Sequence, residues 1–392
     1  MLVRMRNLIH SATVVSGGQS IKHAWIEFDA DGIIARGTDD TWRARAAEHP
    51  EATVIDGTGR VITPGLIDLH CHGGAAVAFE QGPEAIRTAL ALHRSHGTTR
   101  AVVSFVSGGI DDLVERLGGV ADLVETDPGV LGSHLEGPFL DPGHRGAHDP
   151  EALRTPDMRT VDRLIEAGQG TLRQITIAPE LDGAAEAIRE LTAAGVIVAV
   201  GHTDADYAAA RAAFDAGATL LTHAFNAMHP IHHRAPGPVL AAVDSPGVTL
   251  EVINDGVHVH ESVVRLAFTE APGRIALVTD AMAATGAADG LYSLGSLEVM
   301  VTDGTARLVE GGAIAGSTLT LDAALHRAVH VVGIALPEAV RALTETPARV
   351  LGRERDLGSL EPGYPADVLL WSDDLTLQRV WAGGTEYPAA GA

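Results

Sequence analysis

The segment Ile67-Asp68-Leu69-His70-Cys71-His72-Gly73 sets two histidines two positions apart at the end of an apolar run. On a β-strand the side chains of residues i and i+2 lie on the same face, so this spacing predicts that His70 and His72 point the same way. Two neutral imidazoles directed at one point suit a divalent metal ion such as zinc, and the glycine lets the backbone turn away. Taken alone, the segment is equally compatible with a polar strand end.

Composition limits what kind of protein this is. The chain has 392 residues, 46% of them hydrophobic, one cysteine and a formal net charge of -23 at pH 7. This length provides for one large core and a smaller appendage, and the negative charge argues against a nucleic-acid-binding surface, which needs a basic stripe. The single cysteine excludes an intrachain disulfide. Together with the lack of a signal-peptide pattern and of a membrane-spanning apolar run, this predicts a soluble cytoplasmic protein that has no membrane partner.

The middle of the chain alternates short β-branched runs with Ala-, Leu- and Glu-rich helical stretches, which is typical of βα units around a parallel sheet. The predicted strands are Leu66–His70, Thr99–Phe105, Val130–His134, Gln174–Ile177, Val196–Val200, Leu220–His223, Val248–Ile253 and Ile275–Thr279. The predicted helices are Pro83–Ser95, Ile110–Val124, Gly183–Ala194, Ala205–Ala216 and Glu261–Thr269. The pattern predicts an α/β protein with a (β/α)8 TIM-type barrel, and a doubly wound open sheet is the structural alternative.

Unusual polar residues follow the predicted strands and favour the barrel. They are His70 and His72 after the first strand, Glu136 after the third, His202 after the fifth, His223 and Asn226 after the sixth, His258 after the seventh and Asp280 after the eighth. In a barrel the carboxyl ends of all strands surround one mouth, where these side chains would converge. In an open sheet they would be spread along an edge.

Both ends of the chain contain β-like pieces that do not fit the barrel. They are Ala12–Val15, Ala24–Phe28, Ile33–Arg36 and Thr53–Ile55 near the start, and Val368–Trp371 and Thr376–Trp381 near the end. We therefore predict a small β-sandwich built from both termini. Its first part is residues 1–58, the barrel is residues 59–352, and its second part is residues 353–392.

Several motifs stand in order along nearly the whole chain: His70-Cys71-His72, Gly132–Phe139, Val200–Thr203, Thr222–Met228, Val278–Ala281, Pro347-Ala348 with Leu351-Gly352, and Gly358–Asp367. They resemble those of the amidohydrolase superfamily and, more narrowly, of the N-acetylglucosamine-6-phosphate deacetylase family. No lysine stands at the end of the fourth strand, where Ala178-Pro179-Glu180 is found, so a carboxylated-lysine bridge like that of urease is not available.

The residue types also support metal-assisted hydrolysis of an amide. Glu136, His202 and His223 would supply three protein ligands and leave one position for a water molecule, whose pKa a metal lowers to about 7. A second ion held by His70 and His72 and bridged by Glu136 is also feasible. The prediction is one or two divalent ions per chain, zinc first, with Fe²⁺ and other ions also suited to these ligands.

Asp280 is the predicted proton-transfer residue. A carboxylate beside an attacking metal-bound water can accept its proton as general base and pass it to the departing amine as general acid. The competing interpretation is that Asp280 caps a helix that begins at Ala281-Met282.

The resemblance implies further roles around the substrate. It implies that His148 polarises the scissile carbonyl, that Ala147 lies beside it, and that Ile314, Ala315 and Gly316 close over the sugar. The neighbouring His144 is expected to be an exposed loop histidine without a role.

An anionic substrate on so acidic a chain needs local positive charge, which the loop Met228–Arg234 provides. Arg234 can hold a phosphate through its guanidinium fork, and the backbone near Asn226 and Ala227 and the ring of His258 can complete the cradle. For His229, His232 and His233 the alternative is that they are solvent-exposed side chains of this loop and do not bind the substrate. The resemblance implies the same phosphate contacts and a homodimer in which Arg234 reaches the neighbouring subunit's site.

The resemblance, together with these residues, implies metal-dependent deacetylation of N-acetylglucosamine 6-phosphate, a phosphorylated amino sugar, to glucosamine 6-phosphate and acetate. An N-acetylgalactosamine-6-phosphate deacetylase is the alternative with the same chemistry. A catalytically silent barrel that binds a ligand is the alternative from a different class.

Overall fold

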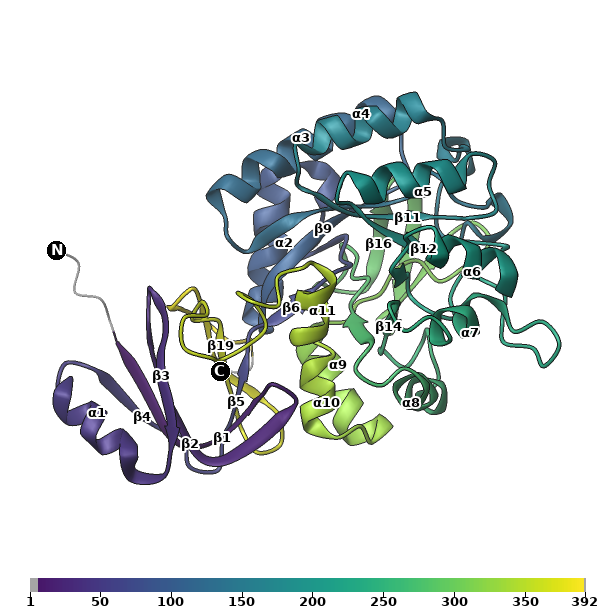
Figure 1. Ribbon diagram of the computed structural model, residues 1–392. Helices are drawn as coiled ribbons and strands as arrows, with labels where there is room; N and C mark the ends of the chain where they lie inside the picture. The colour runs from purple at the N-terminus through teal and green to yellow at the C-terminus, as the bar shows by residue number, and fades with distance from the viewer. Residues whose placement is uncertain (1–5, 391–392) are drawn as a thin grey trace. The chain divides into compact units, whose positions relative to one another are not determined.

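A computed structural model describes residues 6–390 of the chain (Figure 1). The described residues group into two compact units. One comprises the residues up to Ile67, His93–Arg100 and the residues from Leu321 on, and the other comprises Asp68–Leu92 and Ala101–Thr320.

The first unit is built on an eight-stranded sheet from both ends of the chain, with the order β21-β20-β19-β5-β1-β2-β3 and with β4 paired to β1. Its strands are β1 (Asn7–Ser16), β2 (Gln19–Asp29), β3 (Gly32–Thr38), β4 (Thr53–Asp56), β5 (Val61–Pro64), β19 (Val368–Trp371), β20 (Leu377–Ala382) and β21 (Thr385–Tyr387). Neighbouring strands are antiparallel except that β1 runs parallel to β4 and to β5.

One apolar cluster forms the core of this sheet, and it joins residues from both chain ends. Ile9, Ile26 and Phe28 from the first strands pack with Leu370 and Trp381 from the last ones. Helices of this unit are η1 (Asp39–Thr41), α1 (Trp42–Glu48), α9 (Leu321–Arg327), η5 (Ala328–Val332), α10 (Leu336–Arg341) and α11 (Glu345–Val350).

The second unit is organised by an eight-stranded parallel sheet in the order β15-β14-β13-β12-β11-β10-β9-β6. The strands are β6 (Leu66–Asp68), β9 (Thr98–Val106), β10 (Val130–Glu136), β11 (Leu172–Ile177), β12 (Ile197–Val200), β13 (Leu220–Leu221), β14 (Thr249–Ile253) and β15 (Ile275–Val278). Nearly every residue of these strands is buried, as expected where both faces of a parallel sheet are covered.

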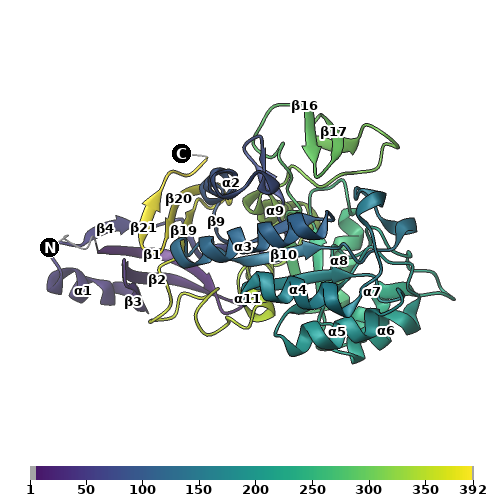
Figure 2. The same ribbon diagram turned by 90° about the horizontal axis from the view of Figure 1, so that it is seen from above.

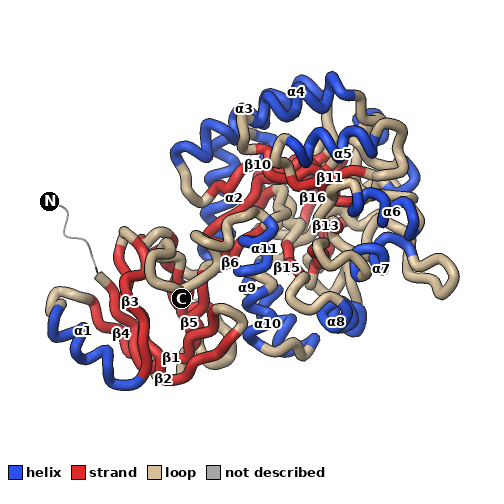
Figure 3. The backbone as a smooth tube through the Cα atoms, in the orientation of Figure 1, coloured by secondary structure: helices blue, strands red, loops and turns tan. Residues whose placement is uncertain are grey.

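Helices alternate with these strands and flank the sheet (Figure 3). They are α2 (Pro83–Ser95), α3 (Ile110–Thr126), α4 (Met158–Gly168), α5 (Ala184–Ala193), α6 (Tyr207–Asp215), α7 (Gly237–Val243) and α8 (Glu261–Glu270), with short turns η2 (Phe79–Gln81), η3 (Pro142–His144) and η4 (Pro150–Ala152). Helix α4 shows why they form. The Asp157 side chain caps its first turn, and Val161, Leu164 and Gly168 give it one buried stripe.

Contacts beyond the ends of β15 and β6 bring the sheet nearly to closure. The backbone N–H of Asp280 donates to the carbonyl of His70 at 2.8 Å, and Cys71 and Ala281 form a parallel bridge. The Thr279 hydroxyl also donates to the carboxylate of Asp68 at 2.6 Å. These contacts place the first and last strands side by side, so the open-sheet alternative is wrong and the barrel is confirmed.

The predicted strands and helices of the barrel are all present, as are the β pieces at both termini, which form one continuous sheet. Helices α4 and α7 were not predicted from the sequence. Neither was the small antiparallel insertion of β16 (Gly290–Leu294), β17 (Leu297–Thr302) and β18 (Thr305–Leu308). In Figure 2, β16 and β17 stand out from the rest of their unit. A further hairpin pairs β7 (Gly73–Gly74) with β8 (Val77–Ala78). Among residues 6–390, none of the helices combines the length and apolar character needed to cross a membrane.

The buried ion pair of Arg100 and Asp367 gives a test of the first unit. Two guanidinium nitrogens of Arg100 lie 2.6 and 3.1 Å from the two carboxylate oxygens, and both side chains are about nine-tenths buried. Arg100→Met leaves the carboxylate without its charged partner, so we expect a loss of about 3 kcal/mol in the free energy of unfolding, measured by urea denaturation.

Two further variants control this measurement. Arg100→Met combined with Asp367→Asn should recover part of the loss, because the asparagine is neutral and still accepts from the N–H of Gly383. Arg87→Met, which breaks an exposed pair with Glu84, should change stability by less than about 0.5 kcal/mol. Equal effects of Arg100→Met and Arg87→Met would contradict the assignment.

Candidate metal centre and active site

Glu136 lies at the centre of the site, and the end of β10 positions it. Every residue of β10 is buried, so the strand delivers the carboxylate to the barrel mouth with only 4% of the residue exposed. The next residue, Gly137, has φ of 91°, and a Cβ there would lie 2.3 Å from the hydroxyl oxygen of Ser107. Only glycine fits this turn, which ends the strand directly after the carboxylate.

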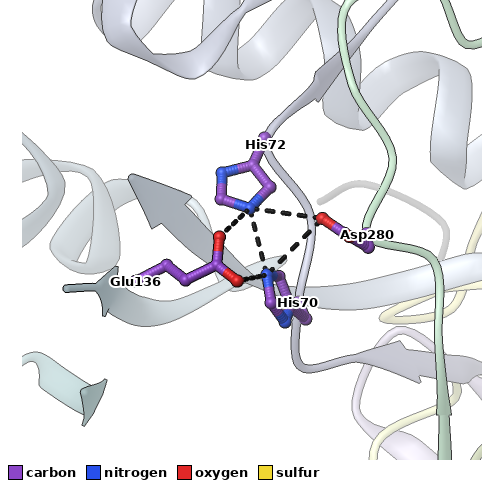
Figure 4. Close-up of side chains that lie close together, drawn as sticks. All are labelled: His70, His72, Glu136 and Asp280. Carbon is purple, nitrogen blue, oxygen red and sulfur yellow. Dashed lines mark hydrogen bonds and ion pairs between the residues drawn. The ribbon is translucent and has the colours of Figure 1, made fainter. Parts of the chain in front are cut away.

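His70 and His72 converge on Glu136 from the end of β6, as the strand spacing predicts (Figure 4). Their Nε2 atoms are 3.0 Å apart. His72 Nε2 lies 3.2 Å from Glu136 Oε2, and His70 Nε2 lies 3.5 Å from Glu136 Oε1. Cys71 between them is buried, with its Sγ 3.6 Å from the carbonyl oxygen of Gly73.

His202 and His223 approach the other side of the same carboxylate from the ends of β12 and β13. The Nε2 atom of each lies 3.0 Å from Glu136 Oε1, and the two Nε2 atoms are 3.0 Å apart. Both residues have positive φ, 48° and 24°, which turns the chain sharply where each strand stops. One carboxylate thus contacts four imidazole rings.

The donor set fits a divalent metal. Two imidazole nitrogens on one tetrahedral ion are ~3.4 Å apart when each metal–nitrogen bond is ~2.1 Å, and both histidine pairs come close to this separation. The ligand atoms of His70, His72, Glu136 and Asp280 all lie within 4.8 Å of one another. No lysine or arginine lines the pocket around them, so protons or a metal must balance the buried carboxylates.

The pKa shifts of Glu136 and His70 agree with a site for a divalent metal. Burial opposes ionisation of Glu136, but the charges and hydrogen bonds of His70, His148 and His202 outweigh it and hold the pKa of the carboxyl well below its usual range. Burial likewise disfavours the charged form of His70, yet the carboxylates of Glu136 and Asp280 prevail and raise its pKa well above the ordinary value. The site is therefore built to concentrate positive charge around one ionised carboxylate.

Asp280 faces the first histidine pair from the end of β15. Its Oδ1 lies 3.4 Å from His72 Nε2 and 3.6 Å from His70 Nε2, and its φ of 49° turns the side chain into the mouth. The competing sequence interpretation, a helix capped by Asp280, is wrong, because turns follow it and the next helix, α9, begins at Leu321.

His148 lies next to Glu136, and its ring is hydrogen-bonded to Ser107. The backbone N–H of Ser107 donates to His148 Nδ1 at 3.2 Å, so this nitrogen is an acceptor and the proton belongs on Nε2. Nε2 lies 3.3 Å from Glu136 Oε2. Burial lowers the pKa of His148 to about 4, which keeps the ring neutral near pH 7. A neutral ring with Nε2–H directed into the pocket can donate a hydrogen bond there.

These side chains line a cavity of about 370 Å³, a size typical of small-molecule sites. The predicted residues that line it are His72, Glu136, Ala147, His148, His202, His223, Asn226, Ala227, His258, Asp280, Ile314 and Gly316. Three predicted site residues do not line the cavity. His70 and Ala315 are fully buried, and Arg234 is exposed and contacts His233.

Asn226, Ala227 and His258, which are predicted to hold a phosphate, all line the cavity. His258 Nδ1 lies 2.7 Å from the Asp255 carboxylate. Burial disfavours its charged form, but this hydrogen bond and charge overcome it and raise the pKa of His258. The backbone N–H of Asn226 already donates to the carbonyl of His223 at 3.0 Å.

Sequence reasoning missed Glu251, a fully buried carboxylate on β14. It accepts from Gln174 Nε2 at 2.9 Å, lies 3.2 Å from His70 Nδ1, and accepts from the backbone N–H of His223 at 3.4 Å. A carboxylate on Nδ1 fixes the tautomer that leaves Nε2 free for a metal. The available signal was a charged residue in the middle of the apolar run Val248–Ile253.

Comparison with known proteins agrees with this geometry. The model of the amidohydrolase family matches residues 61–386. N-acetylgalactosamine-6-phosphate deacetylase of Escherichia coli O157:H7 is 39% identical over 91% of this chain and 92% of that protein. Human N-acetylglucosamine-6-phosphate deacetylase is 35% identical over 83% of each chain.

The fold of a solved structure agrees as well. N-acetyl-D-glucosamine-6-phosphate deacetylase of Mycobacterium smegmatis, in a mutant complex with N-acetyl-D-glucosamine-6-phosphate, superposes with a TM-score of 0.92 at 39% identity, covering 97% of this chain and 99% of that one. The chain therefore belongs to the amidohydrolase family of amide hydrolases and, within it, to the N-acetylglucosamine-6-phosphate deacetylase family.

Proposed function

We propose that this protein removes the acetyl group of N-acetylglucosamine 6-phosphate with the help of a divalent metal and releases glucosamine 6-phosphate and acetate. The single observation that supports this best is the Glu136 carboxylate, which lies within 3.5 Å of five imidazole Nε2 atoms, those of His148 and of the two histidine pairs, beside a substrate-sized cavity. Relatives that share most of their length with the chain act on phosphorylated N-acetyl amino sugars.

The metal would be held by Glu136, His202 and His223, and a second ion by His70, His72 and the same Glu136 carboxylate. Such an ion supplies Lewis acidity toward water and the amide carbonyl. Zinc suits this mixture of nitrogen and oxygen ligands, and Fe²⁺ is compatible with it.

Asp280 moves the proton. It faces the cavity beside His72, where it can take a proton from the attacking water as the new C–O bond forms. When the C–N bond breaks, the same carboxyl passes this proton to the amine nitrogen. The products are acetate and the free amino sugar, so the atoms balance without another co-reactant.

His148 assists at the carbonyl oxygen. Its Nε2–H, fixed by the Ser107 contact, can donate to the oxygen as negative charge develops there. A single preorganised donor of this kind contributes about 3 kcal/mol to stabilisation of the transition state.

The substrate phosphate is assigned to His258, to the backbone turn at Asn226 and Ala227, and to Arg234. We propose that Arg234 acts in the site of a second subunit of a homodimer, because in its own chain it is exposed and does not line the cavity. The sugar would lie against Ala147 and the segment Ile314–Gly316. A cytoplasmic location fits a substrate that carries a phosphate.

N-acetylgalactosamine 6-phosphate is the second candidate substrate, because the Escherichia coli relative that is 39% identical is named for it. The two sugars differ only in the configuration at C4, so the acetyl and phosphate contacts above apply to both.

Metal-reconstituted protein should release amine from N-acetylglucosamine 6-phosphate, and Asp280→Asn should lower kcat by ~10²–10⁴ because the proton carrier is lost. Primary amine is titrated for both phosphosugars, and metal per chain is measured by elemental analysis. The Asn variant should retain most of its metal. A higher kcat/KM for the galacto sugar would reassign the substrate, and no amine from either sugar would reject both candidates.

Glu251→Gln should weaken metal binding by ~10–100-fold, because the amide group cannot accept from all three donors that now face the carboxylate. Metal retained per chain is measured against increasing chelator. Glu186→Gln, an exposed change on α5, serves as the matched control and should titrate like the unmodified protein. Equal metal retention in both variants would show that Glu251 does not orient His70 for binding.

Mixing two impaired variants tests the role of Arg234 across subunits. Arg234→Ala should raise KM for the phosphosugar at least tenfold, and Asp280→Asn should be inactive. If Arg234 serves the neighbouring site, mixed dimers regain low-KM turnover, since a chain with intact Asp280 receives Arg234 from its partner. Activity of the mixture that stays at the sum of the separate variants would place Arg234 in its own chain's site or outside it.

A further inference from the structure

A second group of metal-ligating side chains lies at the rim of the cavity, in three loops that follow β10, β12 and β13. It consists of His144, Asp204 and His229, which we call the rim cluster. His229 Nε2 lies 2.8 Å from Asp204 Oδ1, and His144 Nδ1 lies 3.7 Å from the same oxygen. The three ligand atoms all lie within 4.8 Å of one another, and none belongs to the group around Glu136.

A neighbouring carboxylate orients His144. Asp141 Oδ2 lies 2.9 Å from His144 Nδ1 and also accepts from the backbone N–H of His144, which fixes this carboxylate at the start of η3. Asp204 is held as well, because its backbone N–H donates to Glu180 at 2.6 Å. The rim cluster thus combines two imidazoles and one carboxylate on anchored loops.

The same loops hold residues of the Glu136 centre. His202 Nδ1 lies 3.0 Å from the carbonyl of His144, and the backbone N–H of Asp141 donates to the carbonyl of His202 at 2.9 Å. The backbone N–H of Thr203 donates to the carbonyl of Ala227 at 3.1 Å. His144 itself lines the cavity. A metal ion bound by His144, Asp204 and His229 would therefore connect three segments that shape the cavity entrance.

We propose that the rim cluster binds one divalent transition-metal ion, separate from the ions of the Glu136 centre, and ties the three loops together at the cavity rim. Imidazole nitrogen with carboxylate oxygen suits Zn²⁺ and Co²⁺, whereas Mg²⁺ and Ca²⁺ prefer oxygen ligands alone. The side chains of Asp204 and His229 are 59% and 46% exposed, so an ion can enter and leave without opening of the barrel. This role replaces the expectation that His144 has none, and it does not depend on the reaction proposed above.

Without an ion, the rim cluster would be an ordinary set of exposed ion pairs. Such pairs contribute little to stability and take up no transition metal with fixed stoichiometry. An ion bound only to the folded state would raise the melting temperature with its concentration by mass action. The two possibilities therefore differ in stoichiometry and in thermal stability.

The test uses protein loaded with Zn²⁺ at the Glu136 centre and gel-filtered in phosphate-free buffer. Titration with ZnCl₂ in a calorimeter should show one further ion bound per chain, with a rise in melting temperature. His229→Ala and Asp204→Asn should each weaken this event at least tenfold and remove the thermal shift. His232→Ala, which changes another exposed histidine of the same loop, should keep both.

Metal retained after gel filtration and circular dichroism check that each variant is folded and keeps its Glu136 centre. If retained metal and circular dichroism are unchanged, loss of the additional Zn²⁺ binding in His229→Ala and Asp204→Asn, but not in His232→Ala, supports the rim site. Absence of the event in the unmodified protein overturns the proposal. So does an event that persists in both variants, since the ion would then bind at other surface histidines.

Discussion

The contact of one buried carboxylate with two histidine pairs, His70 with His72 and His202 with His223, is the constraint around which this structure is arranged. Glu136 Oε1 lies 3.0 Å from His202 and His223, while Oε2 faces His72. A buried carboxylate is tolerated only when charge and hydrogen bonds compensate its lost hydration. The histidines provide this compensation in pairs, and each pair has the spacing of ligands on one ion. The same arrangement therefore satisfies stability and prepares the chemistry.

This convergence requires a closed barrel, because the five residues come from four strands far apart in sequence. The backbone bond from Asp280 to His70 and the hydroxyl of Thr279 on Asp68 join the last strand to the first. The same closure places Asp280 beside His70 and His72. Positive φ at His202, His223 and Asp280 ends each strand abruptly, so that the side chains turn inward at the rim. Backbone strain at the strand ends is thus part of the site.

Residues directly after strands could be predicted from the sequence, since buried apolar runs locate the strands and the i, i+2 rule orients their side chains. His70, Glu136, His202 and Asp280 follow from this reasoning. Glu251 could not be assigned in the same way, because its partners lie 77 and 181 positions away, and only the fold brings them together. The rim cluster joins three loops whose paths no periodicity describes. The insertion β16–β18 likewise had no counterpart in the repeat pattern.

The charged groups around Glu136 differ from those around His258 on the same cavity. At the metal end, carboxylates collect positive charge. At the other end the lining contains no lysine or arginine, and the cation on hand is His258, whose pKa the carboxylate of Asp255 raises after burial has opposed it. That pair is nearly neutral as a whole, so it orients an anion better than it attracts one. In the proposed function, the exposed Arg234 of a second chain supplies the full positive charge that this pair does not.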